Sequence, residues 1–343
     1  MKRITYPLLT LLLLVTVVTG AFAGAGNRTG SGGASELLIP VGTRDIAMGG
    51  STISTAKGIE ALYFNPAGAA RMRNSASVYF SHMSYIADIG VDYGAVSTSF
   101  EGFGVLSLSV KSLSIGDILE TTTLVPDGTG KTFSPQFFTV GLTYSRELSD
   151  RVAVGITTNL ISERMAEVSA TGVAFNVGVV YDNLANLSGL SLGVVVKNIG
   201  PQMKFDGPGL NRIAQNSDLS RGPTIFKIDA APFELPSTLE FGVGYKRSFE
   251  GDNSILLSGS FQNNNFSDDE YKLGAEYAYQ DLIFVRGGLN VSAAESEKEY
   301  IYGPAFGAGI HTAVGSLDLT FDYAFRSADI FDNNHVFSLM LGF

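Results

Sequence analysis

The run Gly128-Thr129-Gly130-Lys131-Thr132 is the part of the chain that most resembles a chemical motif. Glycines beside a lysine and a hydroxyl can bind phosphate through backbone N–H groups and the ammonium. A P-loop also needs a glycine five residues before Gly130, where this chain has Val125, and it needs a preceding strand and a following helix. We therefore interpret the run as a glycine-rich loop and expect no nucleotide site.

Other reactive residue types are scattered. The three histidines, His82, His311 and His335, are far apart and none adjoins a run of carboxylates. Acidic residues cluster at 268–270 and 329–332, without the spacing of an EF-hand calcium loop. Cysteine is absent, which excludes a disulfide and a thiolate site. Because no nucleophile, base and orienting residue occur together, we expect no enzyme activity, no cofactor and no metal site.

The N-terminus has the features of a secretory signal. Lys2 and Arg3 precede the apolar run 8–18, and the small-x-small pattern 21–23 follows it. The run is shorter than the roughly 20 residues of a membrane helix, so we expect a signal peptide over 1–23 that is cleaved after Ala23. No later stretch reaches the roughly 18 apolar residues of a membrane helix. A membrane-spanning chain must then be a closed β-barrel.

The last nine residues, 335–343, predict a strand with two unlike faces. One face carries large and mostly apolar side chains, and the other carries mostly small or polar ones. The pattern resembles the terminal strand of bacterial outer-membrane barrels, and that resemblance implies recognition by the barrel-assembly machinery. The assembly signal would comprise Phe337, Leu339, Leu341 and Phe343.

Composition agrees with an exported barrel. The net charge of the whole chain is -10, and loss of Lys2 and Arg3 with the signal peptide makes the mature chain -12. An acidic chain lacks the basic face that nucleic acid requires. With 40 glycines and only 16% charged residues, the chain is unusual for a soluble domain.

From Ala76 onward the chain alternates with period 2, which indicates strands. About fourteen segments are each long enough for a tilted membrane strand of roughly 9–11 residues, and an even number suits a single-chain barrel. They lie near 76–85, 90–100, 102–112, 136–147, 151–164, 170–183, 189–199, 236–249, 252–263, 268–280, 281–293, 301–312, 315–326 and 334–343. Charged side chains on the inward face would pair with one another and with a lumenal segment, or would line a ligand path. They are Glu240, Lys246, Lys272, Glu276, Arg286, Asp318, Asp322 and Arg326.

The connections mostly alternate between long and short, as in outer-membrane barrels with short periplasmic turns. The long links include 113–135 and 200–235, whereas 148–150 is among the short ones. Aromatic residues near the predicted turns would form an interfacial girdle. They are Phe100, Tyr144, Tyr181, Tyr245, Tyr277 and Phe343.

The segment 24–75, between the signal peptide and the barrel of 76–343, is different in character. Asn65 followed by Pro66 predicts a capped helix start and a short helix to about Met72. The pair Gly49-Gly50 predicts a tight turn.

Two blocks of this segment resemble the N-terminal signature of the PorV/PorQ-like proteins of the FadL (OmpP1/FadL/TodX) superfamily. The blocks are 44–50 and 61–68, and the pieces 172–178 and 126–133 also resemble family blocks. The resemblance implies an all-β, transmembrane antiparallel barrel of about 14 strands whose N-terminal segment forms a lumenal hatch with short helices. The hatch motif would comprise Arg44, Asp45, Ala47, Met48, Gly49, Gly50, Asn65, Pro66, Ala67 and Gly68.

Three functions follow as hypotheses for a monomeric barrel in outer-membrane lipid. The first is a non-enzymatic accessory of type IX-like secretion, which the resemblance implies, with outer loops that bind secretion components or cargo. The second is a FadL-like channel for fatty acids or other hydrophobic small molecules. Its ligand path would be lined by Leu37, Leu38, Ile39, Met48, Leu62 and Phe64. The third is a structural barrel without cargo.

Overall fold

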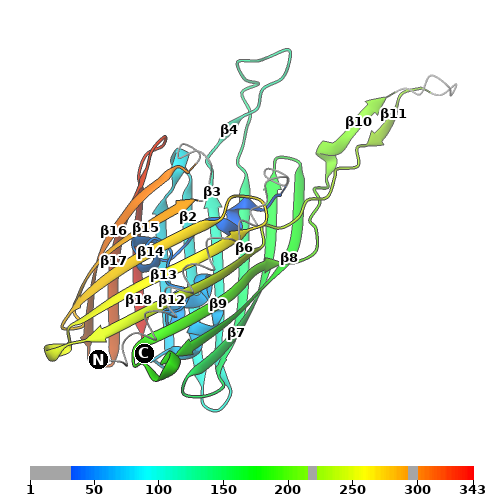
Figure 1. Ribbon diagram of the computed structural model, residues 1–343. Coiled ribbons are helices and arrows are strands. Elements are labelled where there is room, and N and C mark those ends of the chain that lie inside the picture. The colour runs from blue at the N-terminus through cyan, green and yellow to red at the C-terminus, as the bar shows by residue number, and fades with distance from the viewer. Residues whose placement is uncertain (1–31, 215–221, 293–299) are drawn as a thin grey trace.

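The computed structural model describes residues 32–214, 222–292 and 300–343, so the predicted signal peptide and its cleavage site lie outside the described residues. Within that part of the chain, fourteen antiparallel strands close into one barrel (Figure 1). This confirms the predicted fold class. The barrel strands are β1 (Ala76–Ser84), β2 (Gly90–Phe100), β3 (Gly104–Ser114), β6 (Gln136–Glu147), β7 (Val152–Met165), β8 (Val168–Asp182), β9 (Leu190–Ile199), β12 (Thr238–Ser248), β13 (Ser254–Asn264), β14 (Glu270–Tyr279), β15 (Ile283–Ser292), β16 (Tyr302–Val314), β17 (Leu317–Ala328) and β18 (Asn334–Gly342).

Each barrel strand pairs with the next one along the chain, and the last pairs with the first. The closing ladder between β1 and β18 runs from Ser77 opposite Gly342 to Ser84 opposite His335. Closure leaves no free sheet edge, which is the condition for crossing a bilayer with strands.

The two ends of the barrel differ. At the turn end, which holds the C-terminus, the links are short, such as 148–151 between β6 and β7. At the loop end, two long links carry small hairpins of their own, β4 (Ile118–Leu119) with β5 (Thr132–Phe133) and β10 (Asn211–Ala214) with β11 (Thr224–Lys227). Both hairpins project away from the barrel (Figure 1).

The outer and inner faces of the wall differ as the alternation predicts. On β18, Phe337 and Leu339 are exposed on the outside, whereas Val336 and Ser338 are buried inside. Exposed apolar side chains occur on the outer face of every barrel strand from β1 to β18, and such a surface suits lipid. None of the helices in the described residues is long and apolar enough to cross a membrane.

Residues 32–75, called the hatch below, pack against opposite sides of the wall and so occupy the lumen. The hatch contains five short helices: η1 (Ser35–Leu38), α2 (Thr43–Ala47), η2 (Gly58–Glu60), α3 (Ala61–Phe64) and η3 (Pro66–Arg71). The predicted helix after Asn65 is η3, and the Asn65 side chain accepts a hydrogen bond from the Ala67 N–H at 3.1 Å. Further short 3-10 turns lie in the links: η4 (Ile86–Asp88), η5 (Leu184–Asn186), η6 (Pro208–Leu210) and η7 (Glu250–Asp252).

Candidate functional site

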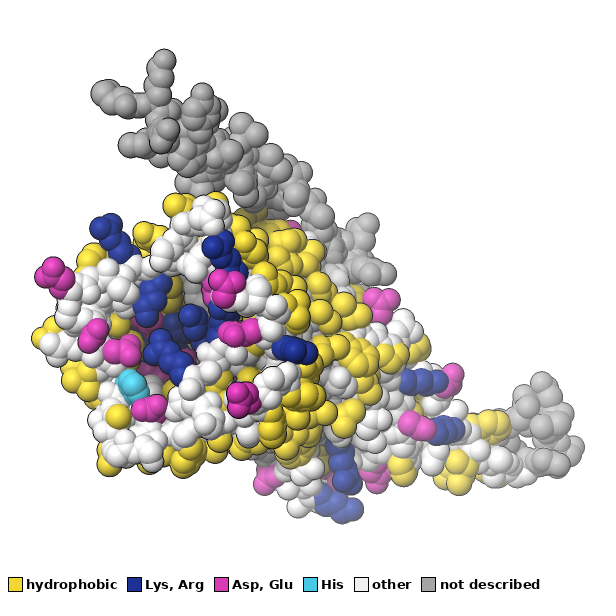
Figure 2. Space-filling model, turned by 90° about the horizontal axis from the view of Figure 1, so that it is seen from below, with side chains coloured by type: hydrophobic (Ala, Val, Ile, Leu, Met, Phe, Trp, Pro, Cys, Tyr) yellow, Lys and Arg dark blue, Asp and Glu magenta, His cyan; other side chains and the backbone are white. Residues whose placement is uncertain are grey.

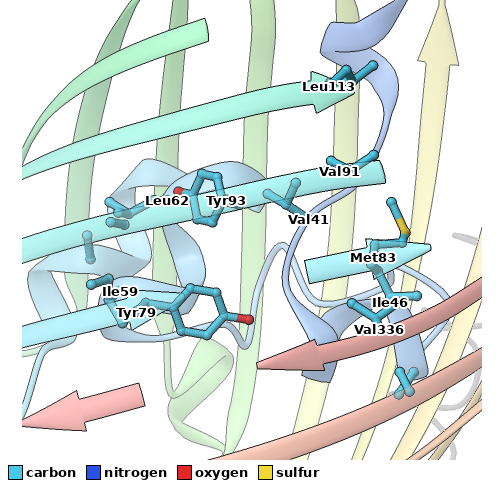
Figure 3. Packing of buried hydrophobic residues seen from close by; sticks show 14 residues of the cluster. Val41, Ile46, Ile59, Leu62, Tyr79, Met83, Val91, Tyr93, Leu113 and Val336 are labelled. Carbon is cyan, nitrogen blue, oxygen red and sulfur yellow. The ribbon is translucent and has the colours of Figure 1, made fainter. Parts of the chain in front are cut away.

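The hatch and the wall share one apolar core (Figure 3). Val41, Ile46, Ile59 and Leu62 of the hatch lie in this cluster with inward-facing side chains of the wall. The labelled wall members are Tyr79, Met83, Val91, Tyr93, Leu113 and Val336. The wall therefore presents apolar as well as polar side chains to the lumen, and burying them favours a seated hatch.

Small residues of the wall allow the hatch backbone to approach closely. A Cβ atom at Gly288 of β15 would lie 2.1 Å from the carbonyl carbon of Met48, and one at Gly178 of β8 would lie 1.9 Å from Asn65 Oδ1. Neither position has room for a side chain unless the hatch moves. The turn that follows α2 has positive φ at Gly49 and Gly50, 66° and 75°, which glycine adopts without strain.

A network of buried charges fastens α2 to the wall. Arg44 donates two hydrogen bonds to Glu276 of β14, at 2.8 Å from Nε and 3.1 Å from Nη2. Glu276 also accepts a hydrogen bond of 2.6 Å from Arg286 Nε, and Arg286 is paired with Asp322 of β17. We call Arg44, Glu276, Arg286 and Asp322 the clamp. Two-pronged pairing of a guanidinium with a carboxylate fixes geometry as well as charge.

Two acidic groups of the hatch lie near the clamp. Burial raises the pKa of Asp45 to about 6, although Arg44 opposes the shift. Burial also raises the pKa of Glu60 to about 8, again against Arg44. The two carboxyl oxygens of Asp45 have no hydrogen-bond partner. Deprotonation of either group therefore works against the seated hatch.

A second anchor lies at the other motif block. Asn65 donates hydrogen bonds to the carbonyl oxygen of Ile53 at 2.9 Å and to that of Val179 on β8 at 3.2 Å. One side chain thus joins two parts of the hatch to the wall. Residue 32 anchors the start of the described hatch at the loop end, where Gly32 bridges to Glu234.

The ten residues of the predicted hatch motif lie in the two regions where the hatch contacts the wall, around the clamp and around Asn65. Arg44 and the following motif residues to Gly50 lie against β14 to β17, and Asn65 to Gly68 lie against β6 to β8. Each motif block thus contacts a different part of the wall.

The hatch borders a large and a small cavity. The larger, of about 810 Å³, opens at the turn end and is called the vestibule. Seen from that end, it is a hollow with cationic side chains inside and acidic ones at its rim (Figure 2). The smaller, of about 40 Å³, is lined by Leu37, Leu62 and mainly polar side chains such as Lys111 and Lys197.

The six residues predicted to line a hydrophobic ligand path do not gather in one pocket. Leu37 and Leu62 border the small cavity, and Ile39 packs against the shared core. Met48 and Phe64 are buried. The remaining residue, Leu38, is 37% exposed.

Of the residues predicted as an assembly signal, Phe337, Leu339 and Phe343 are exposed on the outer face of the wall, and Leu341 is partly buried. The predicted lumenal charges face inward as expected, and several pair with each other. Glu240 pairs with Lys197, and Lys272 lies 3.5 Å from Glu270.

The structure assigns partners that the sequence did not indicate. His82 Nδ1 lies 2.7 Å from Asp92 Oδ1 on the neighbouring strand, and His311 Nε2 lies 3.8 Å from Asp318. Each of these histidines thus has a single carboxylate nearby, because strand pairing brings together residues that are distant in sequence. Lys111 of β3 is a further contact to the hatch that the sequence does not indicate, and its Nζ donates a hydrogen bond to the carbonyl oxygen of Glu36 at 2.6 Å.

No family model matches the chain and no curated protein matches it in sequence. Solved structures do match in fold. The Pseudomonas putida toluene transporter TodX is 11% identical with a TM-score of 0.56, over 88% of this chain and 96% of that one. The Ralstonia pickettii toluene transporter TbuX is 13% identical with a TM-score of 0.53, over 88% and 98%. A Pseudomonas aeruginosa FadL homologue is 13% identical with a TM-score of 0.52, over 88% and 98%. At these identities the likeness shows a shared fold, which spans nearly the whole length of each neighbour.

Proposed function

We propose that this chain is an outer-membrane channel for hydrophobic small molecules, with the hatch as its gate. In this arrangement the loop end faces the outside and the turn end faces the periplasm, as in barrels with short periplasmic turns. The observation that carries the proposal is a barrel whose fold matches the solved toluene transporters and whose lumen is filled by a separate chain segment. The secretion role implied by the sequence blocks has no support from these neighbours.

The geometry of the hatch supports a gate. The hatch continues into the wall at β1 and is otherwise held by non-covalent contacts, namely side-chain contacts such as the clamp and Asn65 and the backbone bridge between Gly32 and Glu234. The vestibule already opens the lumen from the turn end. A ligand that enters from the loop end can then reach the vestibule if the hatch shifts.

The test is a reversible lock. Ser51 Oγ of the hatch lies 2.6 Å from Ser258 Oγ of β13, so the double variant Ser51→Cys/Ser258→Cys places two thiols in contact. Because the chain has no cysteine of its own, this disulfide is unique. Uptake of radiolabelled toluene or oleate by cells that lack other hydrophobic channels should stop when the pair is oxidised and return on reduction.

The control is Ser51→Cys alone, which should transport under both conditions. Equal uptake by the oxidised and reduced double variant would refute a gating hatch. No uptake of either compound by the wild-type chain would refute the proposed substrate class.

An accessory role in secretion is a second candidate, and the β10–β11 hairpin favours it. Ile213 and Ile225 lie opposite each other on this hairpin and are 78% and 67% exposed. The hairpin projects away from the barrel, so the wall does not cover these side chains (Figure 1). Exposed apolar patches often mark partner surfaces. Ile213→Asn/Ile225→Asn should then lose co-purifying secreted proteins, whereas Ile330→Asn, at another exposed loop-end position, should keep them.

A further inference from the structure

The vestibule contains a group of cations that the clamp does not use. Lys57, Arg71 and Arg73 come from the hatch and Lys246 comes from the end of β12, and all four line the vestibule. Figure 2 shows cationic side chains gathered inside this hollow. Segments that are far apart in sequence therefore bring like charges to one space.

Carboxylates balance this group only in part. Arg71 is paired with Asp182 at the end of β8, and Asp281 lies 4.0 Å from Arg73. The charged side chains that line the whole vestibule are seven cations and five carboxylates, which leaves an excess of two positive charges. The Lys57 side chain is exposed to the vestibule, yet partial loss of hydration next to the surrounding protein lowers its pKa. Asp182 opposes this shift, whereas the nearby cations Arg71, Arg73 and Lys246 add to it.

Several hydrogen-bond donors of the group are unused. The Nε and Nη2 atoms of Arg71 have no hydrogen-bond partner, although they are buried. In the described part of the chain, neither Lys57 nor Lys246 forms an ion pair through its ammonium group. A cluster with spare donors and repelling charges is stabilised when an anion enters it.

We infer that the vestibule binds a phosphate-bearing ligand between the hatch and the wall, at Lys57, Arg71, Arg73 and Lys246. A phosphomonoester carries about -1.5 to -2 charge at pH 7 and three strong acceptor oxygens, which matches the excess of two positive charges. A carboxylate brings only one charge. Guanidinium groups also pair with phosphate through two parallel hydrogen bonds.

The rest of the vestibule determines the kind of molecule. Its volume of about 810 Å³ far exceeds that of inorganic phosphate, and Met72, Leu190 and Met340 give it apolar surface. The ligand is therefore an organic phosphate. It comes either from solution as a soluble phosphomonoester or from the adjacent leaflet as a lipid headgroup. Since three of the cations belong to the hatch and one to the wall, bound phosphate ties the hatch shut.

The experiment uses the full-length protein with two probes. Glycerol 3-phosphate is titrated calorimetrically into the protein in neutral detergent at low salt. Phosphatidic acid is presented in nanodiscs, against phosphatidylcholine nanodiscs as the blank. The variants are Lys57→Met, Lys246→Met and the double variant, and Lys131→Met, on a loop at the opposite end, is the matched control. Heat-modifiable migration on gels verifies folding.

Each single variant should weaken binding at least about tenfold, the value of one charge-assisted hydrogen bond. The double variant should abolish binding, and Lys131→Met should leave it unchanged. Binding of glycerol 3-phosphate supports a soluble ligand, and binding of phosphatidic acid alone supports a lipid headgroup. If the double variant fails to fold, the affinity of Lys246→Met alone tests the inference. This single variant should fold, because the Lys246 side chain is exposed at a strand end. The inference is overturned if the wild type binds neither probe, or if Lys246→Met binds with wild-type affinity.

Discussion

The clamp sets how firmly the hatch is seated, and Glu276→Gln tests it. The substitution keeps the shape of the side chain but removes the charge that both Arg44 and Arg286 contact. Arg286 keeps Asp322 as a partner. Among the ion pairs of the described residues, Arg44 then keeps the one with Asp45, in which Nη1 lies 3.9 Å from Oδ1.

The magnitude follows from burial. The side chains of Arg44 and Glu276 are 12% and 10% exposed, so solvent screens the pair little. Removing one partner of a buried ion pair costs about 3–5 kcal/mol. The retained amide oxygen still accepts one hydrogen bond, so we expect the lower figure, which corresponds to roughly a hundredfold rise in hatch opening.

The assay is single-channel conductance in planar bilayers, with the open-time fraction as the readout. Glu270→Gln is the matched control, because it makes the same chemical change on the same strand where Glu270 pairs with Lys272 rather than with the hatch. An open-time fraction for Glu276→Gln equal to that of the wild type, in a folded barrel, would refute the clamp as the element that holds the hatch.

Three further predictions use one reporter, the rate at which maleimide labels Ser51→Cys, which is buried in the seated hatch. Asn65→Ala removes two hydrogen bonds to backbone carbonyls, worth about 1 kcal/mol each, and labelling should quicken roughly tenfold or more; an unchanged rate would contradict the anchor. Gly288→Val forces the hatch off β15 because a Cβ would lie 2.1 Å from Met48, so labelling should approach the rate of a free thiol, while Gly94→Val, with nothing within 4 Å of its Cβ, should not change it. Since burial raises the pKa of Glu60 from its ordinary 4.5 to about 8, the seated hatch binds a proton that a solvated hatch loses in this range, and seating weakens as pH rises from 4.5 to 8. The labelling rate, taken at each pH relative to that of a free thiol, should therefore rise over that interval in the parent. Asp45, whose pKa burial raises to about 6, contributes to the lower part of the rise. Glu60→Gln should remove the part above pH 6, and an unchanged profile there would rule out Glu60 as its source.

The sequence predicts the barrel well because each strand carries its own evidence. The period-2 alternation is local, and a residue that faces lipid must be apolar wherever its partners lie. The closing strand illustrates this, since Phe337 and Leu339 face outward as the alternation alone requires. The capped start at Asn65 is equally local.

Contacts between the hatch and the wall are not local, and the sequence does not determine them. Arg44 and Glu276 are 232 residues apart, and they meet only because the barrel closes in one register. The lumenal side of β1 is also ambiguous, because Tyr79 and Met83 face inward although they are apolar, while Phe80 faces outward. Apolar hatch residues such as Met48 pack on the barrel wall. Residue type alone therefore cannot distinguish residues that line a ligand path from residues of the core between hatch and wall.

The seam between the first and last strands has a consequence for assembly order. The hatch precedes β1, whereas the ladder that joins Ser77 to Gly342 forms between the two ends of the wall. That pairing has the largest sequence separation in the barrel, so its loop-closure entropy makes it a slow and late step. The hatch is synthesised before any wall strand, so the wall can fold around the hatch. In a circular permutant that moves residues 32–75 behind β18, the hatch would have to enter a barrel that has already closed. This permutant should assemble more slowly than the natural chain.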